Sequence, residues 1–247
     1  MIDLHCHILP FVDDGAEDAS VACAMAKHCL RSGVDTVVVT PHCNLFGARN
    51  NFAGRSYEEC LGMFRALLRQ QHIPLKVLPG AELFAHSSNL GTLLDNRKVV
   101  TLNRSRYLLT EFNFRAHPDA INTALERITR RGYIPVIAHP ERYDAVQEQP
   151  ELAAQWFQKG YIIQLNKGSL LGRLGRGAYE CSTFLLRAGI AHVIASDAHN
   201  MDTRPTGFLS LIPLLRQLCP QEYIDILLQD NPAHIIADEP IPIINYD

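Results

Sequence analysis

The sequence predicts an α/β fold, a distorted barrel of parallel strands surrounded by helices, and three observations support it. Short apolar segments alternate with longer amphipathic ones along the whole chain. A glycine falls between a helical segment and the next apolar one at Gly33, Gly132, Gly160 and Gly189. Residue types that bind metals follow several apolar segments. With 247 residues, the chain is expected to form one domain over 1–247.

Seven short apolar segments are predicted as strands: residues 2–5, 36–40, 76–83, 107–112, 133–138, 161–165 and 192–195. The stretches between and after them are predicted as helices: residues 18–31, 56–71, 119–131, 150–159, 177–188 and 207–219. Four residues have the chemistry of helix starts: Asp18, Ser56, Asp119 and Pro150. Residues 241–247 are expected to form a surface strand or an ordered arm.

The repeated order of helix, glycine and apolar strand indicates parallel strands joined by right-handed crossovers. An open doubly wound sheet is the alternative, but it would spread the strand ends along one edge. A barrel brings the ends of all strands to one mouth. Because the candidate ligands follow strands throughout the chain, the sequence favours an incomplete or distorted barrel.

Composition excludes several classes of protein. The net charge is −3 and no run of lysine or arginine occurs, so no nucleic-acid partner is expected. No apolar run approaches the ~18–20 residues of a membrane span. The seven cysteines form no C-x-x-C pair, which is typical of free thiols in a reducing compartment. We therefore expect a cytoplasmic enzyme without membrane insertion.

The most informative motif is the pair His5 and His7 on the first predicted strand. In an extended chain these two side chains point to the same face, and Cys6 points away from them. The following loop holds Asp13 and Asp14 before a glycine. For Asp14, a role as metal ligand and a role in a turn or helix cap are equally good explanations. For Asp13, the turn or helix cap is the better explanation.

Carboxylates within apolar strands are the second sign of a metal site. Glu82 and Glu111 both follow apolar residues, and burying such a group is costly unless it is paired or bound to a cation. A buried ion pair is the alternative for each. Asp197 and His199 repeat the spacing of two residues seen at the first strand.

Taken together, nine residues are candidate metal ligands: His5, His7, Asp14, His42, Glu82, Glu111, His139, Asp197 and His199. Nine exceed the needs of one ion, so two or three ions are expected. Mixed imidazole and carboxylate ligands suit Mn²⁺, Fe²⁺ or Zn²⁺. The other histidines are expected at the surface or packed on helices: His28, His72, His86, His117, His192 and His234.

These residues resemble a known family. The segments DLHCHILP (3–10), VDDGA (12–16), TPH (40–42), HPERY (139–143) and SDAH (196–199) resemble the polymerase and histidinol phosphatase (PHP) superfamily. Within it they are similar to bacterial protein-tyrosine phosphatases that act with tyrosine autokinases in capsule and exopolysaccharide production. Two departures stand out: Phe11 replaces the usual glycine, and residues 43–55 diverge.

The resemblance implies a distorted (β/α)7 barrel with a trinuclear, usually manganese-dependent site. It assigns one ion to His5, His7, Glu82 and Asp197, a second to Glu82, Glu111 and His139, and a third to Asp14, His42 and His199.

Two arginines follow the ligands closely, Arg142 after His139 and Arg204 after His199. Each is expected to contact phosphate, with a surface ion pair as the alternative. The predicted reaction is hydrolysis of phosphotyrosine by metal-activated hydroxide, without a covalent phosphoenzyme. No general acid is assigned, because a phenolate with a pKa near ~10 leaves readily.

Three other functions stay open at this point: a small-molecule phosphatase such as histidinol phosphatase, a polymerase-associated nuclease, and a non-catalytic module that keeps the fold. A homo-oligomer is also possible.

Overall fold

The computed structural model describes residues 1–46, 50–85 and 88–242, and its paired strands are all parallel. The strands are β1 (Ile2–Cys6), β2 (Thr36–Val39), β3 (His42–Cys43), β4 (Lys76–Leu78), β5 (Glu82–Phe84), β6 (Tyr107–Glu111), β7 (Ile134–Ala138), β8 (Ile162–Asn166) and β9 (Val193–Ala195). Within these residues they form two sheets, ordered β1-β2-β4 and β3-β5-β6-β7-β8-β9.

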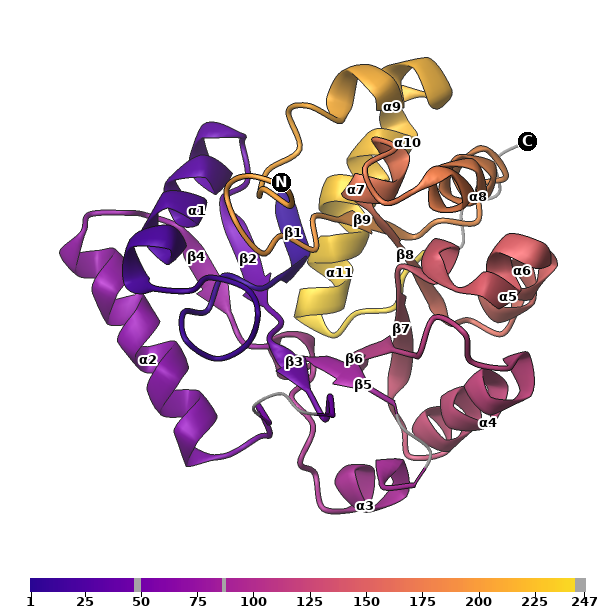
Figure 1. Ribbon diagram of the computed structural model, residues 1–247, viewed down its shortest axis with the longest axis horizontal. Coiled ribbons are helices and arrows are strands. Elements are labelled where there is room, and N and C mark those ends of the chain that lie inside the picture. Colours follow the sequence, from indigo (N-terminus) through magenta and orange to yellow (C-terminus); the bar gives the residue numbers. More distant parts are fainter. Residues whose placement is uncertain (47–49, 86–87, 243–247) are drawn as a thin grey trace.

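The two sheets follow one another around a ring. The chain runs from β2 directly into β3 and from β4 directly into β5, so the nine strands occupy seven positions. Backbone hydrogen bonds join β1 to the residues after β9: the amide of Asp197 donates to the carbonyl of His5, and that of His7 to Ala198, each at 2.8 Å. Figure 1 shows the strands around the centre and most helices outside them. The predicted α/β class with parallel strands is confirmed.

The helices are α1 (Ala19–Arg31), α2 (Arg55–Gln70), α3 (Leu90–Asp95), α4 (Pro118–Thr129), α5 (Asp144–Glu148), α6 (Glu151–Gln158), α7 (Lys167–Leu170), α8 (Arg176–Arg187), α9 (Ile212–Leu218), α10 (Gln221–Asp225) and α11 (Asn231–Ala237). A π-helical stretch, Ile226–Asp230, joins α10 to α11. Short 3-10 turns occur at Leu102–Arg104 and Pro140–Arg142.

Most predicted elements are confirmed with small shifts at their ends. Asp18 caps α1 as expected, because its side chain accepts a hydrogen bond from the amide of Val21. The start at Ser56 was wrong, since α2 begins at Arg55 after Gly54. Asp119 also lies inside its helix, which starts at Pro118. The helix predicted over 207–219 forms only from residue 212, because a run of turns precedes it.

The predicted strand 76–83 is broken in two at Pro79 and Gly80. A Cβ on Gly80 would lie 2.6 Å from a methyl carbon of Val38, so the close approach to β2 requires glycine. The Tyr57 hydroxyl donates to the Gly80 carbonyl at 2.7 Å and accepts from its amide at 2.9 Å. These bonds replace the ladder that the break removes.

Of the two forms expected for residues 241–247, a strand is not formed at 241–242, whereas Ile241 packs partly buried against the inner core, as an ordered arm would; residues 243–247 lie outside the described part. Residues 47–49 of the divergent segment and His86 also lie outside it. The glycine positions are confirmed: Gly33, Gly132, Gly160 and Gly189 all have a positive φ, between 67° and 83°.

The molecule has an inner and an outer apolar core. The outer core lies between strands and helices and includes the apolar stripe of α4. The inner core lies within the ring of strands and is built from alternate strand residues, as barrel packing requires: Ile2, Leu4, Val38, Leu78, Tyr107, Leu109, Val136, Ala138, Ile162 and Val193.

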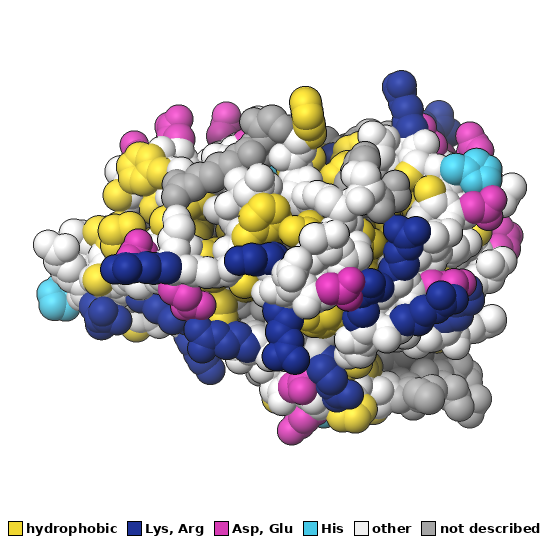
Figure 2. All heavy atoms as spheres, turned by 90° about the horizontal axis from the view of Figure 1, so that it is seen from below, with side chains coloured by type: hydrophobic (Ala, Val, Ile, Leu, Met, Phe, Trp, Pro, Cys, Tyr) yellow, Lys and Arg dark blue, Asp and Glu magenta, His cyan; other side chains and the backbone are white. Residues whose placement is uncertain are grey.

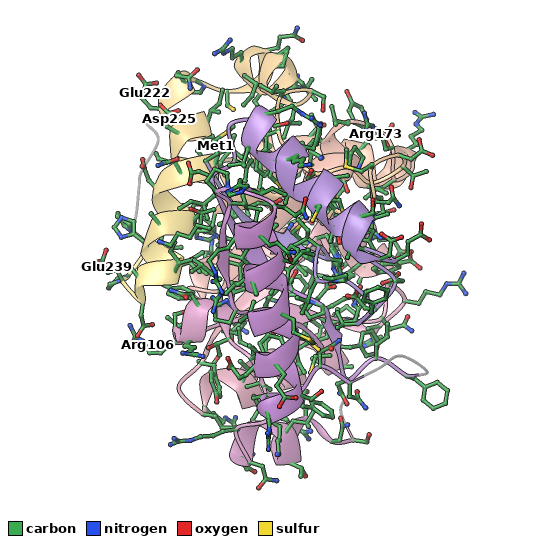
Figure 3. The ribbon with its side chains drawn as sticks, turned by 90° about the vertical axis from the view of Figure 1, so that its left-hand side faces the viewer. Met1, Arg106, Arg173, Glu222, Asp225 and Glu239 are labelled. Atoms are coloured by element: carbon green, nitrogen blue, oxygen red, sulfur yellow. The ribbon has the colours of Figure 1, made fainter. Side chains whose placement is uncertain are left out.

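Helix α11 closes the inner core, because Ile235 is fully buried within it. Figure 3 places Arg106 and Glu239 near the end of α11. There the Arg106 side chain is paired with Asp238 at 3.1 Å, and the Tyr107 hydroxyl donates to the Glu239 carbonyl at 2.7 Å. These contacts attach the end of α11 to the start of β6.

The surface seen in Figure 2 carries acidic side chains among its lysines and arginines. Several ion pairs join separate segments of the chain, among them Arg104 with Glu58 and Arg131 with Asp95. Among the described residues, no helix is both long enough and apolar enough to cross a bilayer.

Phe11 has a left-handed backbone, with φ of 67°, and its side chain is 65% exposed. This conformation costs a residue with a Cβ about 1 kcal/mol, whereas glycine adopts it freely. The glycine that the resemblance leads us to expect at this position would therefore suit the turn better than Phe11 does.

We predict that Phe11→Gly raises the free energy of unfolding by about 0.5–1 kcal/mol, because strain is relieved and little apolar contact is lost. Urea denaturation of chelator-treated protein measures the change. Glu17→Gly is the matched control, since Glu17 is exposed in the same loop without a positive φ, and it should lower stability. Equal losses in both variants would contradict the prediction.

Candidate metal centre

The first strand contains an irregularity that turns its two histidines toward the mouth of the ring. The pairing of β1 with β2 shifts register between Asp3 and Cys6. Leu4 lies in the inner core, whereas Cys6 lies in the outer one, so the inward alternation changes phase between them. As a result the side shared by His5 and His7 faces inward, and their Nε2 atoms lie 3.1 Å apart.

All nine predicted ligands lie at this mouth, where the strands end. Eight of them are buried or half-buried, and Asp14 is exposed. Their donor atoms form four overlapping groups, each with its atoms within 4.8 Å of one another: His7, Asp14, His42 and His199; His5, His139 and Asp197; His5, His7 and Glu82; and His42, Glu82 and Glu111.

The carboxylate of Glu82 lies at the centre of the cluster. Its Oε2 is 3.3 Å from Nε2 of both His5 and His7 and 3.1 Å from Nδ1 of His42. Its Oε1 is 3.1 Å from Nε2 of His139. Burial opposes ionisation, yet the imidazoles of His5, His139 and His42 hold the pKa of Glu82 well below its usual range. Both oxygens of Glu82 thus lie among imidazoles, where they would serve as ligands to a cation.

The hydrogen bonds behind His5 and His7 show that both Nε2 atoms can act as ligands. Gln164 donates to the Leu165 carbonyl at 2.8 Å, so its Oε1 accepts from Nδ1 of His5 at 2.9 Å. Asp13 accepts from Nδ1 of His7 at 2.7 Å. With Nδ1 protonated, each neutral ring presents a lone pair at Nε2. Two such lone pairs 3.1 Å apart repel, and either a proton on one Nε2 or a metal cation beside both would relieve the repulsion.

Unpartnered buried atoms also fit a cation site. Four atoms of the cluster lack a hydrogen bond of acceptable geometry: Nδ1 of His42, Oε2 of Glu82, Nδ1 of His139 and Nε2 of His199. Such groups are rare in folded proteins. Burial and the charge of Glu82 also raise the pKa of Glu111 to about 8. A divalent cation would relieve this repulsion between the two carboxylates, so the donor set fits metal binding.

The contacts of Asp14 and Glu111 agree in part with the groupings that the resemblance implies. Asp14 lies 3.4 Å from Nε2 of both His42 and His199, and the geometry adds His7 to this set. Glu111 lies 3.7 Å from Nε2 of His139 and 3.9 Å from Nδ1 of His42.

Asp197 is held in place by groups on one side of its carboxylate. Its Oδ2 accepts from the Asn166 amide at 2.6 Å and from the Arg204 guanidinium, and lies 3.6 Å from Nη1 of Arg142. Its Oδ1 therefore faces His5, at 3.3 Å from Nε2. Although burial opposes its charge, His5 and Arg204 hold the pKa of Asp197 well below its usual range.

Two of the cluster residues, His139 and Asp197, have left-handed backbones with φ of 33° and 49°. Neither is glycine, so each turn is strained, and strain of this kind concentrates at functional sites. His139 follows directly on the end of the buried strand β7, and Asp197 follows the end of β9 with one residue between.

Sequence reasoning missed the residues that orient the ligands. Gln164 and Asn166 follow Ile162 at alternate positions of β8, so all three face into the ring. The sequence does contain a signal for Gln164 and Asn166: they are polar residues at positions of an apolar strand that should face the interior. For Asp13 no signal separated it from Asp14, because both lie in one loop.

A cleft of about 540 Å³ opens onto the cluster. Glu82, Glu111 and His139 are buried at its base, and both predicted arginines line it, with 21% of the Arg142 side chain and 28% of the Arg204 side chain exposed. Partial exposure of these guanidinium groups beside a buried cluster suits the binding of an anionic ligand.

Comparison with known proteins agrees with the predicted resemblance. A family model described as capsular polysaccharide synthesis, CpsB/CapC, matches residues 1–237. The tyrosine-protein phosphatase YwqE of Bacillus subtilis (strain 168) is 39% identical over 204 residues, covering 83% of this chain and 79% of that protein. The tyrosine-protein phosphatase CpsB of Streptococcus pneumoniae is 30% identical over 247 residues, covering 97% and 99%.

Comparison with solved structures leads to the same family. One, described with YwqE from Bacillus subtilis and CpsB from Streptococcus pneumoniae as metal-dependent tyrosine phosphatases, matches with a TM-score of 0.87 and 33% identity, covering 99% of this chain and 100% of that one. A variant organophosphorus hydrolase from Deinococcus radiodurans has a TM-score of 0.58 and 16% identity over 95% of this chain and 92% of its own, and shares the fold alone. The chain belongs to the CpsB/CapC family of capsular polysaccharide synthesis.

Proposed function

We propose that this chain is a metal-dependent protein-tyrosine phosphatase. The observation that carries the proposal is the cleft itself, in which a buried cluster of imidazoles and carboxylates lies beside two partly exposed arginines. Such a site combines cation ligands with groups that bind the oxygens of a phosphate. The activity named for the similar YwqE and CpsB proteins supports it.

The nine cluster residues are the proposed ligands, and Mn²⁺ is the proposed metal, with Fe²⁺ or Zn²⁺ as alternatives. Bound divalent cations would supply Lewis acidity toward the phosphoryl oxygens and activate water as the nucleophile. Glu82 is proposed to bridge two cation positions, since both of its oxygens face imidazoles.

The chain's own residues orient the substrate. Arg142 and Arg204 approach Asp197 from the cleft side, and each has further N–H groups free to donate to phosphate oxygens. The planar guanidinium geometry allows two parallel hydrogen bonds to one phosphoryl group. No side chain is assigned as general acid, because a phenolate is an adequate leaving group.

The proposal extends to the biological setting. The substrate is a phosphotyrosine protein, proposed to be a bacterial tyrosine autokinase, which fits the capsule-synthesis family. A cytoplasmic location is part of the proposal, because the seven cysteines are free thiols. We also propose that residues 1–247 act as one domain.

Turnover of four substrates by Mn²⁺-loaded protein tests the proposal: a phosphotyrosine peptide, the matched phosphoserine peptide, histidinol phosphate and single-stranded DNA. We expect the phosphotyrosine peptide to be cleaved best. Much faster cleavage of histidinol phosphate would overturn it in favour of a small-molecule phosphatase, and cleavage of DNA alone would favour a nuclease.

Metal removal should abolish turnover, and re-addition of Mn²⁺ should restore it and raise the melting temperature, because a cation that binds only the folded state stabilises it. His42→Ala and Asp197→Ala should each abolish turnover while circular dichroism stays unchanged. His234→Ala is the control, since His234 pairs with Glu239 away from the cleft. Full activity in both cluster variants would refute the ligand assignment.

We predict that Asp13→Asn weakens metal affinity by about 10–100-fold, because the neutral amide no longer fixes the tautomer of His7. Titration of the metal-free protein with Mn²⁺ measures the change. Asp18→Ala serves as control: it removes the cap of α1 and costs about 1 kcal/mol of stability, but it should leave metal affinity unchanged. An unchanged affinity in Asp13→Asn would contradict the role given to Asp13.

Arg204→Lys should lower kcat/KM for the phosphotyrosine peptide by about a hundredfold, because the ammonium cannot make the paired contacts of a guanidinium. Metal content should stay at the wild-type level, which separates phosphate binding from support of Asp197. Loss of bound Mn²⁺ in this variant would show that Arg204 acts through Asp197 instead.

A further inference from the structure

We infer, on the basis of the proposed phosphatase function, that Phe84 and Phe114 form two walls of a slot that takes the phenyl ring of phosphotyrosine. Both side chains are half-buried and line the cleft above the metal cluster. In this role they determine the preference for phosphotyrosine over phosphoserine.

Phe84 owes its position to the periodicity of β5. It follows Glu82 by two residues, so both side chains point to the same side of the strand and into the same cleft. Two residues of a strand advance the chain by about 6–7 Å. Glu82 is buried at the base, and Phe84 lies that much closer to solvent. The separation between Glu82 and Phe84 along the strand matches the distance at which the ring of a phosphotyrosine would lie above its phosphate bound at the base.

Phe114 is held by contacts on several sides. Its ring packs edge-on against the ring of His139, with centroids 5.9 Å apart at 75°. The guanidinium of Arg142 lies over it, with Cζ 4.3 Å from the ring centroid. Its carbonyl accepts from the amide of Asp144 at 2.8 Å. The ring is thus fixed before substrate arrives, and binding loses little side-chain entropy.

The cleft is charged at its base and apolar along its walls, and a phosphotyrosine side chain changes from charged to apolar in the same order. Glu82, Glu111 and His139 make the base charged, whereas Phe84 and Phe114 make the walls apolar. A phosphotyrosine side chain places its phosphate at one end and an apolar ring in the middle. Aromatic rings favour offset or edge-to-face contact with such walls.

Phosphoserine lacks this middle part. Its phosphate ester oxygen is bonded directly to Cβ, so a phosphate at the base would draw the peptide backbone down between the two phenylalanines. Backbone N–H and C=O groups placed against apolar walls lose their hydrogen bonds to water. The walls therefore favour the longer aromatic side chain and disfavour the shorter aliphatic one.

The test compares kcat/KM for one peptide carrying phosphotyrosine or phosphoserine, in Mn²⁺-loaded wild type and in Phe84→Ala and Phe114→Ala. We expect each variant to lose about tenfold on phosphotyrosine and to change little on phosphoserine, so that the preference falls. Phe184→Ala is the matched control, because Phe184 is 52% exposed on α8 outside the cleft.

Should an alanine variant fail to fold, Phe84→Leu and Phe114→Leu keep most of the volume and should still reduce the preference by about threefold. Unchanged preference in all folded variants overturns the inference. Equal losses on both peptides in Phe114→Ala, with none in Phe84→Ala, also overturn it, since Phe114 would then only position Arg142. If wild type fails to cleave the phosphotyrosine peptide, the proposed function itself is wrong.

Discussion

The buried carboxylate of Glu82 is the feature on which the rest of the site depends. An isolated carboxylate in such a place would be prohibitively costly, and here it is surrounded by imidazoles within 3.1–3.3 Å. Those imidazoles come from β1, β3 and the end of β7, while Glu82 opens β5. The ring of parallel strands brings these chain segments to one point. The buried charge of Glu82 is therefore tolerated only because the fold places its imidazole partners around it.

The rigidity of this arrangement comes from the apolar layer beneath it. On β6, the inward side chains change from Tyr107 and Leu109 to Glu111, and on β8 from Ile162 to Gln164 and Asn166. The polar layer thus stands on a close-packed one, and within the polar layer Gln164 fixes the tautomer of His5 and Asn166 holds Asp197. Preorganisation of this kind keeps metal ligands in place before any cation binds.

The sequence predicted most of the fold because its periodic signals are local. Each of these signals can be recognised from a few neighbouring residues: the apolar segments, the glycines with positive φ, and the ligand residues at strand ends. The break at Gly80 depends on contact with Val38 in another strand, and α11 is short and preceded by a π-helical stretch, so neither has a clear local pattern. Asp13 was missed because nothing in its loop separates it from Asp14, and the one local signal for Gln164, a polar side chain in the inward phase of β8, does not say that His5 on another strand is its partner.

Because α11 closes the inner core, the fold can be completed only late in the synthesis of the chain. β1 precedes the other strands in the chain, yet one of its edges stays unpaired until residue 198 has been made, and Ile235 closes the inner core later still. Until then the growing chain carries an open strand edge, of the kind that invites pairing with other chains. The first two candidate ligands, His5 and His7, can meet Asp197 and His199 only after residue 199 has been synthesised. The complete set of candidate ligands therefore cannot assemble early in translation.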